Sequence, residues 1–231
     1  GLDLQQLNWG TSNAKSVTLS FHVKSNKTGT YVVNLTAADA TNKYQSQTYT
    51  IDSADTWEKK TITYIGETTT AIPDDNTDGA LLEWGLASGT AYTSGGATGK
   101  AWSSAVTSYF GGLNVNILDH TDNEFLLTGV QLEVGQVATP FEHIDFATNL
   151  AKCQRYYQKS YNYGTAPGTG TTVGEIGNDG NPSSGSNTGQ LIDFHSFYCE
   201  MRDTPTMTFY DIVGSSIYNK TYKEKKGKRD R

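Results

Sequence analysis

Apolar side chains at every second position are the feature that most constrains this chain. Between residues 17 and 23 every odd position is apolar, at Val17, Leu19, Phe21 and Val23, and every even position is polar. A period of two places these apolar side chains on one face of an extended strand. The pattern therefore predicts a half-buried β-strand here rather than a helix.

The same alternation returns along the first 134 residues. A turn-forming stretch at residues 25–29 follows the first strand and residues 31–35 resume the pattern, which predicts a hairpin of two paired strands. The further predicted strands are residues 48–51, 57–65, 81–87, 113–118 and 125–134. No helical period separates them, so we predict an all-β fold built on an antiparallel β-sandwich, of which the jelly roll is the commonest large form.

The composition of the chain supports an all-β fold, and its charge and hydropathy limit the kinds of partner that it can bind. Charged residues make up 18% of the 231 residues and there are 24 glycines, which suits strands and polar turns better than helical bundles. Residues 220–231 carry a net charge of +5 and leave −11 on the rest of the chain. An acidic body argues against nucleic acid as the main partner, and no run approaches the roughly 18 apolar residues of a membrane span. We therefore expect neither nucleic-acid binding nor membrane insertion.

A change of period marks the end of the β-rich part. Apolar residues in the stretch 145–161 return at helical spacing, with Asp145 as the predicted N-cap. Two strand-like pieces follow, at residues 191–199 and 206–213, and two strands are too few to close a core. The predicted parts are a jelly-roll sandwich at 1–143, a short helical connector at 144–163 and an incomplete β unit with a basic tail at 164–231. We expect that last unit to be truncated or to be completed by another chain.

Metal binding has one candidate site. Asp74, Asn76 and Asp78 match the opening of a calcium loop, but Gly85 stands where an EF-hand needs its closing glutamate. A full EF-hand is therefore excluded. A structural calcium ion held by these three residues and a plain turn closed by an Asp side chain remain as alternatives.

No catalytic arrangement stands out in the sequence. Acidic pairs lie in solvated turns, and a Gly-x-Ser-x-Gly nucleophile motif is absent. Cys153 and Cys199 lack metal-type spacing, so one disulfide and two free thiols are both open. We expect no enzymatic activity and no cofactor beyond a structural calcium ion.

Aromatic residues in the Gly/Ser/Thr-rich stretch 87–112 make glycan binding the chemistry to test. Sugars present apolar C–H faces and hydroxyls, so a site needs a flat ring beside amides or carboxylates on a rigid surface. Trp84 alternates with Leu82 and Leu86 and is predicted to lie in the core. For Trp102 the alternative is to cap the edge of the sandwich. The candidate glycan-binding residues are Trp102, Tyr92, Tyr109 and Phe110.

Three sequence motifs resemble a block found in tail-fibre and related virion proteins of bacteriophages, notably marine ones. They are FLLTGVQLEVG at 125–135, ATPFEH at 138–143 and CQRYY at 153–157. Residues 7–11, 17–24, 56–58 and 201–210 are also similar to that family, so the resemblance covers nearly the whole chain. The N-terminal part of these proteins is similar to the jelly roll of carbohydrate-binding modules.

The resemblance implies a virion protein, a fibre or spike that adheres to host-surface glycans, with no enzymatic activity and no cofactor. It transfers no sugar-binding residue to this chain. Other virion proteins are then the expected partners, and unpaired C-terminal strand edges predict a homo-oligomer, with a trimer favoured. Two alternatives remain: a head decoration that binds other virion proteins, and a carbohydrate-binding module of a secreted bacterial hydrolase.

Overall fold

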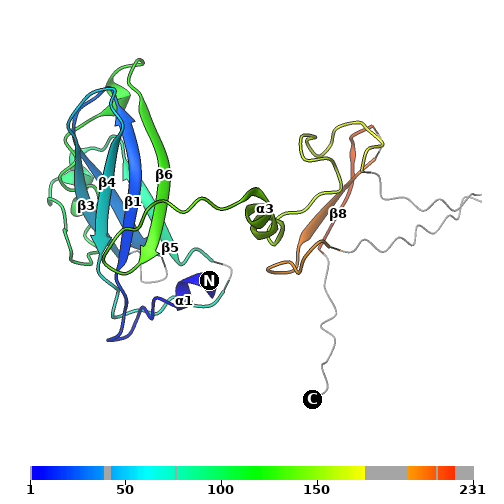
Figure 1. Ribbon diagram of the computed structural model, residues 1–231, viewed down its shortest axis with the longest axis horizontal. Helices are drawn as coiled ribbons and strands as arrows, with labels where there is room; N and C mark the ends of the chain where they lie inside the picture. Colours follow the sequence, from blue (N-terminus) through cyan, green and yellow to red (C-terminus); the bar gives the residue numbers. More distant parts are fainter. Residues whose placement is uncertain (1, 39–42, 76, 175–196, 212, 222–231) are drawn as a thin grey trace, which may run out of the picture. The chain divides into compact units, whose positions relative to one another are not determined.

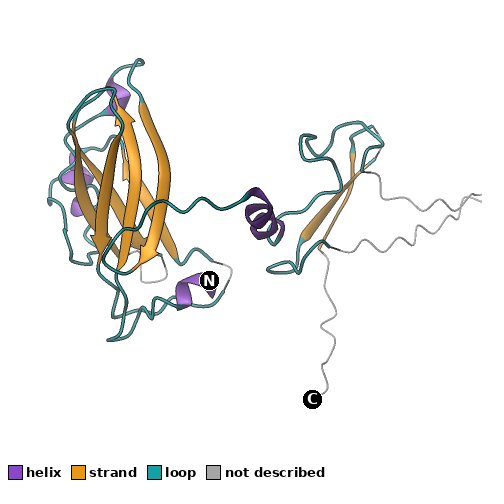
Figure 2. Cartoon of the chain, in the orientation of Figure 1, coloured by secondary structure: helices purple, strands orange, loops and turns teal. Residues whose placement is uncertain are grey.

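The computed structural model describes residues 2–38, 43–75, 77–174, 197–211 and 213–221 (Figure 1). It divides the chain into two units, Gly1–Glu142 and His143–Arg231, and each is described by itself. Strands and loops dominate and the helices are few and short (Figure 2), so the prediction of a mostly β fold is confirmed.

Two antiparallel sheets of three strands each build the first unit. Sheet A has the order β4 (Glu58–Tyr64), β1 (Val17–Ser25), β6 (Phe125–Val134). Sheet B has the order β3 (Lys43–Ile51), β2 (Gly29–Ala37), β5 (Ala80–Gly85). Short helical turns lie outside the sheets, among them α1 (Leu2–Gln5) and the 3-10 turn η2 (Ile117–Asp119).

Side chains from the inner faces of both sheets form one hydrophobic core. Phe21 of β1 meets Tyr49 of β3 and Trp84 of β5 edge to face, with ring centroids 5.1 and 5.8 Å apart. The Tyr64 hydroxyl of β4 donates a hydrogen bond to the Val33 carbonyl of β2 at 3.1 Å. The sheets therefore pack face to face, and the alternating apolar positions line the space between them (Figure 1).

The predicted hairpin between residues 17–23 and 31–35 is wrong. β1 pairs with β4 and β6, whereas β2 pairs with β3 and β5, so the two strands belong to opposite sheets. The turn between them carries the chain from one layer to the other. Alternation tells which side of a strand faces the core, but both layers of a core produce the same pattern.

The predicted strand at residues 113–118 is also wrong. This segment is irregular and ends in the 3-10 turn Ile117–Asp119. Asn114 Oδ1 accepts a hydrogen bond from the Thr30 N–H at 2.7 Å, and Asn116 Oδ1 accepts one from a backbone N–H two residues later at 2.9 Å. Asparagine side chains that bond nearby backbone groups compete with the hydrogen bonds of a strand ladder.

Two glutamines on edge strand β3 join the sheets along one side. Gln45 Nε2 donates to the Ile65 carbonyl at 2.7 Å, and the Ile65 N–H donates back to Gln45 Oε1 at 3.2 Å. Gln47 Nε2 donates to the Thr63 carbonyl at 2.8 Å. These side chains take the place of a strand partner for the edge of sheet A, which stiffens the unit that carries the candidate site.

Among its described residues, the second unit holds one helix and one pair of strands. Asp145 caps the helix as predicted, because its Oδ1 accepts a hydrogen bond from the Thr148 N–H at 2.9 Å. Of the predicted piece at 191–199, residues 191–196 lie outside the described residues and 197–199 form no strand. The last strand was not predicted. The elements are α3 (Phe146–Gln154), β7 (Thr206–Tyr210) and β8 (Ser216–Thr221), the two strands being antiparallel.

The described side chains of the second unit are all exposed or half-buried. Cys153 and Cys199 are free thiols, the first exposed and the second half-buried, so the disulfide alternative is not formed. Within the described part of the chain, no helix has both the length and the apolar composition to cross a bilayer.

Candidate functional site

Residues 87–112, which we call the flap, fold over the outer face of sheet B. The Phe110 ring lies so close to Gly85 of β5 that a Cβ atom there would stand 2.7 Å from its Cδ1. At the edge of β3, Tyr44 and Ser103 exchange two backbone hydrogen bonds of 2.9 Å. The flap contains two short helical turns, α2 (Thr90–Thr93) and η1 (Val106–Ser108).

The flap brings Tyr109 into a polar network on that face. Its hydroxyl donates to Glu83 Oε2, and Thr36 Oγ1 donates to the same oxygen at 3.1 Å. Asn34 Nδ2 donates to the Tyr109 carbonyl at 2.5 Å. The Tyr109 ring also stands edge-on to Tyr44, with centroids 4.6 Å apart. A carboxylate, an amide, hydroxyls and two aromatic rings therefore meet at one place.

In this network the Tyr109 hydroxyl is a hydrogen-bond donor and the Glu83 carboxylate is the acceptor. Burial raises the pKa of Tyr109, and its hydrogen bond to the Glu83 carboxylate raises that pKa further. Tyr109 therefore stays a protonated donor at neutral pH. Glu83 is half-buried, and both bonds reach Oε2, so Oε1 takes part in no hydrogen bond among the described residues. This oxygen is a ready acceptor for a ligand hydroxyl.

Two buried polar atoms beside the network lack partners among the described residues. They are Asn34 Oδ1 and Ser46 Oγ, on residues that lie opposite each other on β2 and β3. Leaving a buried polar atom unpaired costs about 1–3 kcal/mol. Both residues are fully buried beneath the flap, so these atoms are a local cost to the fold and are out of reach of a ligand on the surface.

The predicted aromatic residues fall in different places. Tyr109 lies in the polar network, and Phe110 packs beside it with ring centroids 5.0 Å apart. Tyr92 is exposed, and its carbonyl accepts the Phe110 N–H at 2.9 Å, which ties its backbone to the same part of the flap. The structure therefore brings Tyr92, Tyr109 and Phe110 into one flap over sheet B.

Trp102 lies apart from that network. Its ring packs edge-on against the buried Trp9 with centroids 5.3 Å apart, and its Nε1 donates to the Ile65 carbonyl at 3.1 Å. The ring is thus held against the core by both a contact and a hydrogen bond. This placement favours the alternative in which Trp102 caps the edge of the double layer.

Sequence reasoning missed Glu83, Asn34 and Thr36. Each lies on the outer face of its strand, where alternation predicts contact with solvent. The flap covers this face instead, and Asn34 and Thr36 are buried beneath it. The aromatic residues of the flap were the one available signal, because a loop with rings at residues 109 and 110 needs a surface to pack on.

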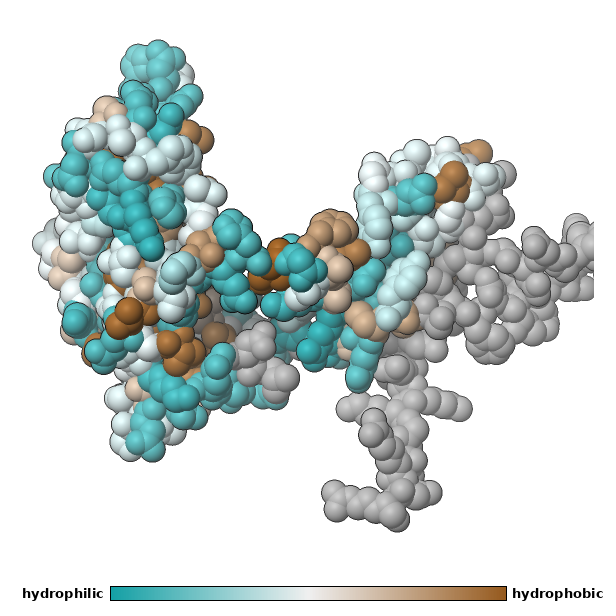
Figure 3. Space-filling view, viewed as in Figure 1, coloured by the Kyte–Doolittle hydropathy of each residue, from teal (hydrophilic) through white to brown (hydrophobic). Residues whose placement is uncertain are grey.

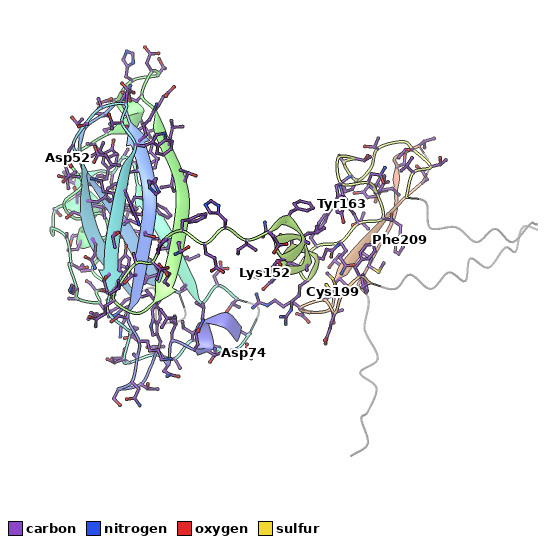
Figure 4. All side chains as sticks on the ribbon, viewed as in Figure 1. Asp52, Asp74, Lys152, Tyr163, Cys199 and Phe209 are labelled. Atoms are coloured by element: carbon purple, nitrogen blue, oxygen red, sulfur yellow. The ribbon has the colours of Figure 1, made fainter. Side chains whose placement is uncertain are left out.

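The predicted calcium residues are only partly described. Asp74 and Asp78 are exposed, and Asn76 lies outside the described residues (Figure 4 labels Asp74). Asp75 Oδ1 accepts hydrogen bonds from the Thr77 N–H at 2.9 Å and from its Oγ1 at 2.6 Å. This is the side-chain-closed turn that the sequence offered as the alternative. Calcium binding here stays a prediction.

The flap can be opened by a change that leaves its polar side chains in place. A Cβ on Gly111 would stand 1.7 Å from the Gly96 carbonyl oxygen, so Gly111→Ala forces the two flap segments apart. Such overpacking costs about 1–3 kcal/mol, and we expect amide hydrogen exchange in the flap to speed up by about tenfold or more. Gly89→Ala is the control, since its Cβ meets no atom within 4 Å. Equal exchange in both variants would contradict a closed flap.

Comparison with known protein families, with curated proteins and with solved structures finds no match to this chain. The function of this chain is therefore inferred from its residues and their geometry. Of these, the network around Tyr109 is the arrangement with the clearest chemistry for a ligand.

Proposed function

We propose that this chain is a non-catalytic attachment module of a bacteriophage virion, a tail-fibre or spike protein that binds glycans on the host surface. The observation that carries the proposal is the network of Glu83, Tyr109 and Thr36 on the outer face of sheet B. It joins an ionisable carboxylate and hydroxyls to tyrosine rings on a stiff sheet. Sugars need this combination of polar partners and flat apolar faces.

Two carboxylates of the first unit, Glu58 and Glu133, lack the raised pKa of a general acid. A general acid needs a raised pKa, as a carboxyl group in an apolar pocket has. The hydrogen bond from Lys60 lowers the pKa of Glu58, and the hydrogen bonds from Thr139 lower the pKa of Glu133. Both side chains also hold backbone N–H groups of neighbouring loops. They act as structural ties.

We further propose that the two sheets form a jelly roll. The first and last strands of the first unit, β1 and β6, are neighbours in sheet A. Of the connections between its six strands, only that from β2 to β3 stays within one sheet, and the others cross between the layers. Repeated crossing between two antiparallel layers is the connectivity that distinguishes a jelly roll from a simple meander.

A virion location follows from the resemblance to phage fibre proteins, with other virion proteins as partners. A single site that offers one carboxylate and a few rings is expected to bind a sugar weakly. Several copies that engage one cell surface raise the overall affinity without new contacts, because the later binding events become intramolecular. Display on a multi-copy fibre therefore suits such a site.

Glycan binding by the full chain and two variants tests the proposal. On a glycan array we expect retention of a subset of glycans. Glu83→Gln and Tyr92→Ala are each expected to weaken binding by about tenfold or more, since a lost charged acceptor or stacking ring is worth about 1.4 kcal/mol. Trp57→Ala is the matched control, because Trp57 is 47% exposed and Tyr92 is 46% exposed.

The outcomes separate the candidate roles. Retention that Trp57→Ala leaves unchanged and Glu83→Gln reduces supports adhesion through the outer face of sheet B. If no glycan is retained at all, the attachment proposal fails and a decoration that binds other virion proteins is favoured. A catalytic domain encoded next to this chain would instead favour a module of a secreted hydrolase.

A further inference from the structure

The Glu83 carboxylate carries a charge that no described cation balances. None of the ion pairs between described residues includes Glu83. It is the one acidic residue in the three strands of sheet B, and their one basic residue, Lys43, pairs with Glu67 instead. The two donors to Oε2 are the hydroxyls of Tyr109 and Thr36, which carry no charge. The network therefore holds a negative charge that the described part of the chain leaves uncompensated.

One oxygen of this carboxylate is open to solvent. Both hydrogen bonds to Glu83 reach Oε2, and Oε1 accepts none among the described residues. Four buried side-chain atoms lack a hydrogen-bond partner in the described part of the chain, and Glu83 Oε1 is not one of them. The two bonds at Oε2 hold the side chain in place while Oε1 remains accessible. A ligand donor therefore meets an acceptor that is already positioned, which lowers the cost of binding.

The acidic residues of sheet A provide a contrast. Its strands contain two, and both have hydrogen bonds at each carboxylate oxygen. Glu58 accepts from the Asp52 N–H at 2.9 Å and from Lys60 Nζ at 2.6 Å, and Glu133 accepts from the Thr139 N–H and hydroxyl. Figure 3 shows the first unit from the sheet A side, where hydrophilic side chains, in teal, cover much of the visible surface. An open, uncompensated carboxylate oxygen thus distinguishes the sheet B strands.

The flap surrounds this charge with aromatic rings and neutral polar groups. Residues 87–112 contain no acidic residue and one basic residue, Lys100, which is exposed and belongs to none of the described ion pairs. The Tyr109 ring reaches the carboxylate through its hydroxyl, and Tyr92 is 46% exposed on the same flap. Aromatic faces attract cations through their quadrupole. A carboxylate beside tyrosine rings therefore suits a ligand that carries a positive charge.

We propose that this site selects amino sugars, whose free ammonium group binds Glu83 Oε1. The inference rests on the proposed glycan-binding function and names its substrate class. An ammonium supplies both a donor and a compensating charge, and such a charge-assisted hydrogen bond is roughly twice as strong as a neutral one. Acidic sugars are repelled by Glu83 and by the net charge of −11 on the chain outside residues 220–231.

A glycan array probed before and after treatment with acetic anhydride tests the selection. The reagent turns each ammonium into a neutral amide and leaves the sugar rings unchanged. We expect the full wild-type chain to be retained by glycans with free amines, and acetylation to lower this retention by about tenfold or more. Sugars that carry carboxylates are expected to retain none of it.

Two substitutions locate the charge that is recognised. Glu83→Gln is expected to bind amine-bearing glycans about tenfold more weakly and to respond no further to acetylation. Glu124→Gln removes an exposed carboxylate just before β6 and is expected to behave as the wild type. Unchanged tryptophan emission, to which the neighbouring Trp84 contributes, shows that β5 stays folded in Glu83→Gln.

Two further probes separate charge from the sugar itself. Tyr92→Ala is expected to weaken binding of the amine and the acetylated glycans by the same factor, because stacking of a sugar on a ring does not depend on its charge. A short lysine peptide presents ammonium groups without a sugar, and we expect it to bind at least about tenfold more weakly than the amine-bearing glycans.

The outcomes distinguish this inference from the proposed function. If the wild type binds glycans equally before and after acetylation, amino-sugar selection is wrong while glycan adhesion stands. If acetylation abolishes binding but Glu83→Gln does not weaken it, the ammonium binds elsewhere. A lysine peptide bound as tightly as the sugars shows that the site recognises the ammonium alone. Retention of no glycan at all overturns the proposed function together with this inference.

Discussion

Replacing Phe21 with alanine is expected to lower the free energy of unfolding of the first unit by about 3–5 kcal/mol. Phe21 is fully buried at the centre of β1, and its ring contacts Tyr49 and Trp84 from the opposite sheet. The substitution removes the ring on which both layers pack and leaves a cavity that the stiff sheets cannot close. Urea unfolding followed by tryptophan fluorescence measures the change, since Trp84 lies against the ring.

Tyr92→Ala is the control for this experiment. It also truncates an aromatic side chain, but that side chain is exposed on the flap, so we expect a change of no more than about 0.5 kcal/mol. The same result shows that any loss of glycan binding in Tyr92→Ala is not caused by unfolding. A cost below about 1 kcal/mol for Phe21→Ala would mean that the two sheets do not share one core.

The sequence was informative where a local pattern has one physical cause. Phe21 is apolar between two polar residues, and it faces the core for that reason. The strand predicted at 125–134 agrees with β6, Phe125–Val134, because alternation and a terminal glycine bound it. Asp145 was recognisable as a cap because its side chain bonds a backbone group only three residues away.

No local pattern in the sequence indicates which strands, far apart along the chain, pair with each other. β1 and β2 have the same alternation whether they lie side by side or face each other, so the hairpin prediction failed on a question that the pattern does not address. The candidate site was likewise predicted only in part, because its residues come from distant segments of the chain. Tyr109 was predicted from its place in a polar loop, but Glu83 was not, because nothing near residue 83 tells which face of its strand the flap covers.

Glu67 is expected to hold the loops at one end of the core, and its removal is expected to cost about 3 kcal/mol. Its side chain is buried, and Oε2 accepts hydrogen bonds from the Thr69 N–H at 2.9 Å and from the Thr70 N–H. Oε1 accepts a hydrogen bond from Thr69 Oγ1 at 2.6 Å and lies 3.4 Å from Lys43 Nζ. Glu67→Ala leaves these donors without their acceptor.

The pH dependence of stability provides a second signature. Burial raises the pKa of Glu67, but the hydrogen bonds from Thr69 and Thr70 and the charge of Lys43 outweigh it, so the pKa lies below its ordinary value. A carboxyl with a lowered pKa in the folded state contributes stability above its unfolded pKa of about 4.3. That contribution is lost as the pH falls through the folded-state pKa.

Urea unfolding from pH 7 down to pH 3 measures both effects. Relative to the wild type, Glu67→Gln is expected to be less stable at pH 7 by about 1–3 kcal/mol, because an amide accepts fewer of these bonds. The difference is expected to shrink as the pH falls below the unfolded pKa towards the lowered folded-state pKa, because the wild-type carboxyl becomes neutral there. Glu124→Gln, an exposed control, is expected to follow the wild-type curve. A Glu67→Gln curve that runs parallel to the wild type across this range would show that Glu67 acts by its shape and not by its charge.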